Sequence, residues 1–131
     1  MESRPLLIVD GANVVGSRPD GWWRDRAGAA ARLRDRLVPL AARGLPPELP
    51  GPAEVLLVVE GAARDVPGRP EVRTVAAPGS GDDTIVALVR DAPDRRRLVV
   101  TADRELRTRV TALGAEVQGP TWLRAHTTGA T

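Results

Sequence analysis

The sequence contains no cysteine, no lysine, no phenylalanine and no tyrosine, and its only histidine is His126. The absence of cysteine excludes disulfides, thiolate zinc ligands and thiol nucleophiles. The single histidine argues against a Ser-His-Asp triad and against a metal site built from several histidines. The absence of lysine excludes a P-loop. Any bound metal must therefore be held by oxygen ligands, which favours Mg²⁺, Mn²⁺ or Ca²⁺.

All nineteen basic residues are arginine, and the net charge at pH 7 is only +2. Because arginine stays charged to very high pH, the sequence pI of 10.7 does not indicate a strongly basic protein at pH 7. No stretch approaches the ~20 apolar residues of a membrane span, and no signal-peptide pattern opens the chain. We expect a cytoplasmic protein without membrane contact. The 131 residues predict one domain over 1–123, followed by a tail over 124–131.

Short apolar runs alternate with helical patterns along the chain. The runs predict buried strands at 6–9, 55–59, 72–75, 98–101 and 115–118. Helices are predicted between them, at 22–43, 82–90 and 104–113. Pro39 is expected to kink or end the first of these helices because proline lacks an N–H. The alternation predicts an α/β fold, a three-layer sandwich with a central parallel sheet of about five strands and helices on both faces.

Carboxylates recur where the predicted strands end. Asp10, Glu60 and Asp103 follow strands, and the Asp82-Asp83 pair opens the helix after the third strand. The carboxyl ends of parallel strands meet at one edge of a sheet, where α/β proteins bind ligands. Carboxylates gathered there repel one another unless a divalent cation neutralises them. The pattern therefore predicts a metal-dependent hydrolase, in which Mg²⁺ or Mn²⁺ activates water for attack on a phosphodiester.

Each of these residues also has a purely structural explanation. Asp10-Gly11 is a turn signal, Asn13 can cap a helix, and carboxylates such as Asp82 and Asp83 favour helix N-termini. Turns and caps accept Asn, Ser and Thr as readily as Asp. The recurrence of carboxylates on several segments at one edge therefore favours the functional interpretation.

Four segments together resemble a known family. Ile8–Val15 is similar to the opening strand and turn of NYN domains, a branch of the PIN-like nuclease superfamily. Gly79–Ile85 resembles the acidic start of the central helix in YacP-like NYN proteins. Val99–Arg104 and Gly114–Val117 are similar to the acidic motif of strand four and to the closing strand. The resemblance spans residues 6–123 and implies a PIN-like fold with metal-dependent endoribonuclease activity.

The resemblance also implies roles for individual residues. Four carboxylates would be catalytic and would bind Mg²⁺ or Mn²⁺: Asp10, Asp82, Asp83 and Asp103. Asp82 and Asp83 point about 100° apart on a helix, so one can bind directly and the other through water. Asn13 would orient water, ligand or substrate, and Thr101 would support the site. Glu60 is an additional candidate ligand, although many relatives have a Phe-Asp-Gly-like sequence there.

Seven residues are expected to contact RNA at the acidic edge: Arg18, Trp22, Arg24, Arg64, Arg69, Arg104 and Arg107. Trp22, expected to be the more exposed of the Trp22-Trp23 pair, could stack on a base, although both rings could instead pack the first helix onto the sheet. The run Arg95–Arg97 precedes a strand and is expected to be a solvated turn at the opposite edge.

Two other functions are compatible with the same sequence. A non-catalytic RNA- or partner-binding module could keep the PIN-like fold without cutting RNA. A toxin-type PIN ribonuclease paired with an antitoxin is the second alternative, although the turn Asp10–Asn13 favours the NYN branch. The expected partner is RNA, with a DNA flap as the alternative substrate and a ribosome or protein partner left unassigned. We expect a monomer or a weak dimer.

Overall fold

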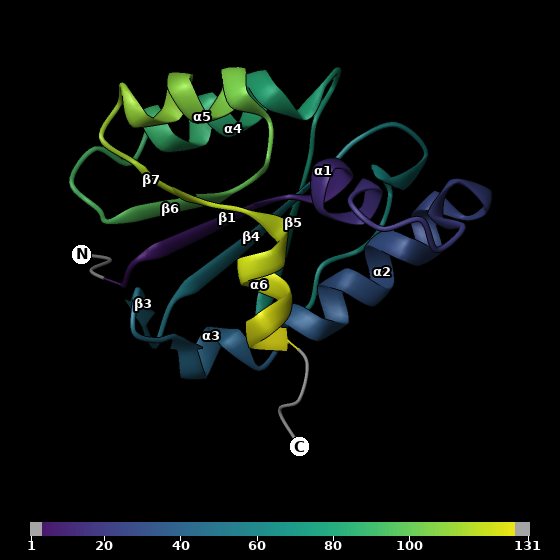
Figure 1. Ribbon diagram of the computed structural model, residues 1–131, viewed down its shortest axis with the longest axis horizontal. Coiled ribbons are helices and arrows are strands. Elements are labelled where there is room, and N and C mark those ends of the chain that lie inside the picture. Colours follow the sequence, from purple (N-terminus) through teal and green to yellow (C-terminus); the bar gives the residue numbers. More distant parts are fainter. Residues whose placement is uncertain (1–3, 128–131) are drawn as a thin grey trace.

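A computed structural model describes residues 4–127 and shows a five-stranded parallel sheet in the order β5-β4-β1-β6-β7 (Figure 1). Its strands are β1 (Leu6–Asp10), β4 (Glu54–Val59), β5 (Val72–Ala76), β6 (Arg97–Val100) and β7 (Glu116–Gln118). The central strand β1 pairs in parallel with β4 and with β6. All five strands therefore end at the same edge of the sheet. Two short strands, β2 (Gly44–Leu45) and β3 (Leu49–Pro50), form a separate antiparallel pair.

Helices cover both faces of the sheet, which confirms the predicted three-layer α/β fold (Figure 1). One face carries α4 (Gly81–Arg90) and α5 (Arg104–Thr111). The other face carries α2 (Arg26–Leu37), α3 (Leu40–Arg43) and α6 (Pro120–Thr127). Shorter segments complete the chain: α1 (Gly11–Gly16) and the 3₁₀ turns η1 (Trp22–Arg24) and η2 (Gly61–Ala63). Within residues 4–127 no helix is both long and apolar enough to cross a membrane.

The sheet is buried on both faces, which explains its continuous apolar strands. Along β1, Leu7 and Val9 belong to the core beneath α2, whereas Leu6 and Ile8 belong to the core beneath α4 and α5. This alternation is the two-residue period of a strand. All five residues of β1 are buried, including Asp10 at its end. The core therefore fixes the position of that carboxylate.

Three segments differ from the sequence-based prediction. The residues after Asp10, expected to be a loop, form the short helix α1. The helix predicted over 22–43 is divided into η1, α2 and α3, and the break before α3 falls at Pro39, as expected from its missing N–H. The segment expected to be a tail from residue 124 continues as helix α6 to Thr127, and residues 128–131 lie outside the described part.

The arginine run at 95–97 lies at the amino edge of the sheet, as predicted, and Arg96 is exposed, but the expected solvation is wrong for Arg97. Arg97 is only 6% exposed and donates hydrogen bonds to the carbonyl oxygens of Val89 (2.7 Å) and Leu113 (3.0 Å). It therefore joins the C-terminal end of α4 to the turn after α5. Its neighbours are also engaged, Arg95 with Glu54 (2.7 Å) and Arg96 with Glu116 (2.9 Å). The three arginines therefore form hydrogen bonds and ion pairs at the edge of the sheet opposite to the acidic residues.

Candidate active site

Asp10 is the buried centre of the acidic edge. It ends β1, caps the N-terminus of α1 and is 6% exposed. Its Oδ2 accepts a hydrogen bond from the Thr101 hydroxyl (2.8 Å), and its Oδ1 accepts one from the Asn13 backbone N–H (3.4 Å). Burial raises the pKa of Asp10 from 3.8 to about 6. The two hydrogen bonds oppose this rise, whereas the nearby charges of Asp82 and Glu60 add to it.

The segment after β6 is tied directly to Asp10. Thr101 is fully buried, and its hydroxyl oxygen accepts a hydrogen bond from the backbone N–H of Asp103 (3.2 Å). The side-chain Oδ1 of Asn13 accepts one from the backbone N–H of Ala102 (2.8 Å). Thr101 and Asn13 therefore hold the ends of β1 and β6 in register. Thr101, which was expected to support the site, is thus in direct contact with Asp10.

Asp103 stands at the start of α5. Its Oδ1 caps that helix by accepting a hydrogen bond from the backbone N–H of Leu106 (2.9 Å). Arg107, one turn further along α5, donates from Nε to the carbonyl oxygen of Thr101 (2.7 Å). The helix is thereby fixed to the end of β6. Arg107 lies at the acidic edge as predicted, but its Nε supports the protein backbone.

Asp82 and Asp83 are placed in different surroundings, although they are adjacent in the first turn of α4. Asp82 is half-buried, and its pKa is raised by burial first and then by the charges of Asp103 and Glu60. Asp83 turns the other way, with an 84% exposed side chain and an ion pair to Arg109 on α5 (3.0 Å). Asp82 therefore belongs to the cluster with Asp10 and Asp103, and Asp83 does not.

Glu60 lies between the end of β4 and the start of α4. Its Oε2 accepts a hydrogen bond from the backbone N–H of Gly81, the first residue of α4. The charge of Glu60 acts on both Asp10 and Asp82 by raising their pKa values. Glu60 is therefore part of the electrostatic cluster, but one of its oxygens is used to position α4.

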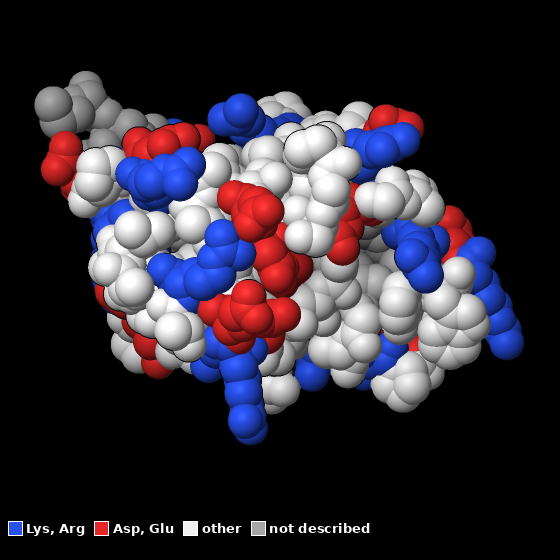
Figure 2. All heavy atoms as spheres, turned by 90° about the horizontal axis from the view of Figure 1, so that it is seen from above, with Lys and Arg blue, Asp and Glu red and all other residues white. Residues whose placement is uncertain are grey.

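Carboxylates gather on the face of the molecule that α4 and α5 form, with arginines beside them (Figure 2). The donor set is entirely oxygen, which fits Mg²⁺ or Mn²⁺. Burial is the main cause of the raised pKa values of Asp10 and Asp82, and the charges of neighbouring carboxylates raise them further. Across residues 4–127, however, no three acidic or histidine side chains are grouped closely enough to ligate one ion together. A shared ion would require the half-exposed Asp82 and Asp103 to turn toward Asp10.

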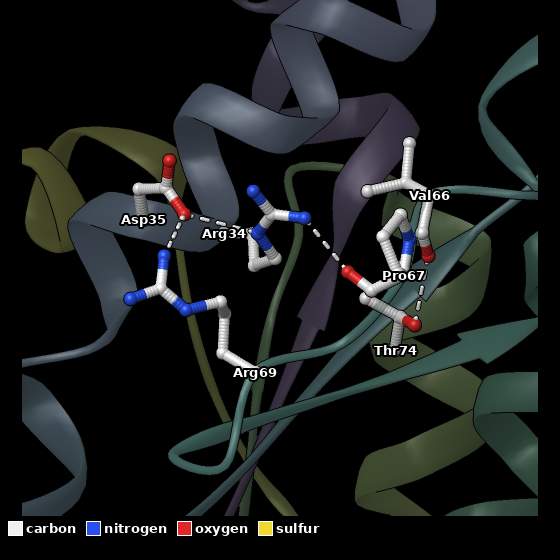
Figure 3. A network of polar contacts seen from close by, with 6 residues as sticks. All are labelled: Arg34, Asp35, Val66, Pro67, Arg69 and Thr74. Atoms are coloured by element: carbon white, nitrogen blue, oxygen red, sulfur yellow. Dashed lines mark hydrogen bonds and ion pairs between the residues drawn. The ribbon is translucent and has the colours of Figure 1, made fainter.

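Arg69 does not lie at the acidic edge, where it was predicted to contact RNA. Its backbone pairs with Val72, the first residue of β5, so Arg69 lies at the amino edge of the sheet. Its guanidinium binds Asp35 on α2 (3.1 Å), and Arg34 joins the same carboxylate (3.0 Å) and the Pro67 carbonyl oxygen (2.8 Å) (Figure 3). The assignment of Arg69 to the acidic edge was wrong because the segment after β4 runs from the carboxyl edge of the sheet back to its amino edge before β5 begins. The ion pair of Arg69 with Asp35 holds this segment against α2.

The tryptophan pair also differs from expectation, because Trp23 is the exposed member, at 52%, and Trp22 is half-buried. Arg24 lies over the Trp23 ring (5.9 Å), and Arg26 lies over the Trp22 ring (5.3 Å). Arg26 was not among the predicted residues, and no helical spacing marks its contact with Trp22, because the two residues belong to different helical segments separated by Asp25. The other predicted arginines are exposed: Arg18, Arg64 and Arg104.

Comparison with known proteins gives structural matches alone, since no family model and no curated protein matches the sequence. The crystal structure of Rae1 (YacP) from Bacillus subtilis matches with a TM-score of 0.74 at 16% identity, covering 97% of this chain and 74% of that one. A Trp-to-Leu variant of the same protein matches with a TM-score of 0.71 at 19% identity, covering 93% and 73%. The chain therefore has a YacP-like fold, as its sequence motifs predicted.

Proposed function

We propose that this protein is a metal-dependent endoribonuclease that hydrolyses RNA phosphodiester bonds at the carboxyl edge of its sheet. One observation carries the proposal. Asp10, Asp82 and Asp103 come from three separate segments, yet the charge of Asp82 raises the pKa of Asp10 and that of Asp103 raises the pKa of Asp82. Folding such a cluster costs free energy, and a divalent cation would offset this cost. The resemblance to YacP-like NYN domains supplies the expected substrate, RNA.

Three carboxylates would hold Mg²⁺ or Mn²⁺ in this proposal: Asp10, Asp82 and Asp103. The metal would supply a water of lowered pKa and a positive charge beside the scissile phosphate. Thr101 holds Oδ2 of Asp10 in place. The amide oxygen of Asn13 is used by Ala102, which leaves its Nδ2 donors for a water or a phosphate oxygen.

One observation favours a second candidate, a non-catalytic RNA-binding module. In the described part of the chain no three carboxylates already converge on one point. A protein that only bound RNA would not need them to do so. The two candidates differ in a single measurable property, which is whether bound RNA is cut.

Labelled single-stranded and structured RNAs, incubated with Mn²⁺, Mg²⁺ or EDTA, test the proposal. We expect cleavage with either metal and none in EDTA. The neighbouring substitutions Asp82→Asn and Asp83→Asn form a matched pair, since both remove one carboxylate from the same helical turn. Asp82→Asn should abolish cleavage, whereas Asp83→Asn should retain most of it. Equal effects of the two substitutions would contradict the site assignment, and binding without cleavage would favour the non-catalytic module.

A further inference from the structure

A cavity of about 360 Å³ opens beside the acidic edge. It lies among the start of α1, the end of β4, the loop before α4 and the indole of Trp22, and small residues such as Gly11, Ala12 and Gly79 line much of it. Three side chains with polar groups, Glu60, Ser80 and Arg26, also face it. A largely apolar cavity of this size with a few polar groups is typical of a small-ligand site.

A second, smaller hollow of about 50 Å³ shares Trp22 with the first. It lies between α2 and α6, and four of its lining residues are arginines: Arg18, Arg32, Arg36 and Arg124. Asp20 is the only acidic residue among those that line it. The guanidinium of Arg124 is engaged with the hydroxyls of Ser17 (2.7 Å) and Thr121 (3.2 Å), so the positive charge that suits a phosphate comes mainly from the other three arginines. Trp22 therefore borders a cavity next to the carboxylates and a hollow that attracts anions.

We infer that the cavity binds one unpaired nucleobase of the RNA, stacked on Trp22, and that an adjoining phosphate lies in the arginine hollow. The inference deepens the proposed function, because it takes RNA as the ligand. Aromatic side chains that stack on splayed bases are the common means of binding single-stranded RNA. A base in a duplex cannot enter a cavity of this kind without leaving its stack. The site thus selects RNA with an unpaired nucleotide at the cut.

The position of the cavity links base binding to cleavage. Gly11 and Ala12 line it, and they directly follow Asp10 in the chain. A base held there brings its own backbone to the acidic cluster. Glu60 uses Oε2 for the backbone of Gly81, which leaves Oε1 to accept a hydrogen bond from an amino or imino group of the base. Every standard base presents such an N–H donor, so this contact would orient the base without selecting among the four.

Binding in EDTA tests the inference independently of cleavage. We would measure fluorescence anisotropy of a labelled single-stranded RNA with the wild-type protein, Trp22→Leu and Trp23→Leu, after confirming by thermal melting that both variants fold. Loss of stacking should weaken binding about tenfold for Trp22→Leu. Trp23→Leu is the matched control, since Trp23 is the more exposed neighbour and does not line the cavity, and it should bind nearly as wild type.

A scan with single abasic nucleotides locates the bound base. Removal of the base at one position should weaken the binding of the RNA to the wild-type protein. The same removal should not weaken binding to Trp22→Leu any further, because that variant has already lost the stacking contact. Equal binding by the two tryptophan variants, equal affinity for duplex and single strand, or no RNA binding at all would overturn the inference. Cleavage that persists with unchanged binding by Trp22→Leu refutes the cavity alone. Normal base-specific binding without any cleavage refutes the nuclease alone.

Discussion

Replacing Asp10 by asparagine should stabilise the protein at neutral pH. The fold raises the pKa of Asp10 from 3.8 to about 6, so the folded state binds its proton more tightly than the unfolded state does. The resulting stability is fully present below pH 3.8 and is lost as the pH rises through about 6. At pH 7 the ionised carboxylate costs about 3 kcal/mol of folding free energy. Asparagine cannot ionise and avoids this cost.

The loss of one hydrogen bond offsets part of that gain in stability. The amide oxygen of asparagine can still accept from the Thr101 hydroxyl, as Oδ2 of Asp10 does. Its NH₂ group would instead face the Asn13 backbone N–H, replacing the long hydrogen bond of 3.4 Å at a cost of about 1 kcal/mol. The net gain at pH 7 is about 2 kcal/mol, or about 7 °C in melting temperature for a chain of 131 residues.

Thermal melts of wild type and Asp10→Asn in EDTA, from pH 4 to pH 8, measure this gain. The two proteins should differ little near pH 4, diverge between pH 4 and about pH 6, and keep a nearly constant difference above that. The exposed Asp94→Asn is the matched control and should follow wild type at every pH. If Asp10→Asn melted at or below the wild-type temperature at pH 7, with the same pH dependence, the reasoning about buried charge would be refuted.

The remaining predictions concern the binding of Mn²⁺, the hydroxyl of Thr101 and the arginines of the hollow. Mn²⁺ should raise the melting temperature of wild type but not of Asp10→Asn, because an ion that binds the folded state stabilises it; equal shifts would place the ion elsewhere. Thr101→Val should raise the pKa of Asp10 further and move the pH–rate profile for cleavage toward higher pH; an unmoved profile would contradict the role of its hydroxyl. The double variant Arg32→Gln with Arg36→Gln should show a weaker salt dependence of RNA binding. The slope of log K against log salt concentration should fall by about 0.7 for each phosphate that the variant no longer neutralises. The exposed Arg90→Gln serves as control, and an unchanged slope for the double variant would exclude phosphate binding in the arginine hollow.

The positions of the carboxylates could be predicted because they depend on a local pattern. Apolar runs mark the strands, parallel topology brings their ends together, and Asp10 and Asp103 follow from these two facts. The difference between Asp82 and Asp83 was not accessible in this way. It depends on the packing of α5, which places Arg109 beside Asp83. No spacing within the chain reveals that interaction.

Two of the errors, those on Arg69 and Arg97, share a physical cause, because both depend on contacts outside the local sequence pattern. Arg69 seemed to follow β4, but the segment from 61 to 71 crosses to the other edge before β5 begins. Arg97 is buried because carbonyl groups at the ends of two helices accept its hydrogen bonds. Helix α1 was missed because six residues, glycine at both ends, are too few to show a helical period.

The central claim is that Asp10 serves catalysis at the cost of stability. Cleavage of a single-stranded RNA in Mn²⁺ by wild type and by Asp10→Asn, each with an EDTA control, tests it most directly. We predict that wild type cuts only with the metal and that Asp10→Asn, although the more stable protein, does not cut. Cleavage by Asp10→Asn at the wild-type rate, or by wild type in EDTA, would contradict the account.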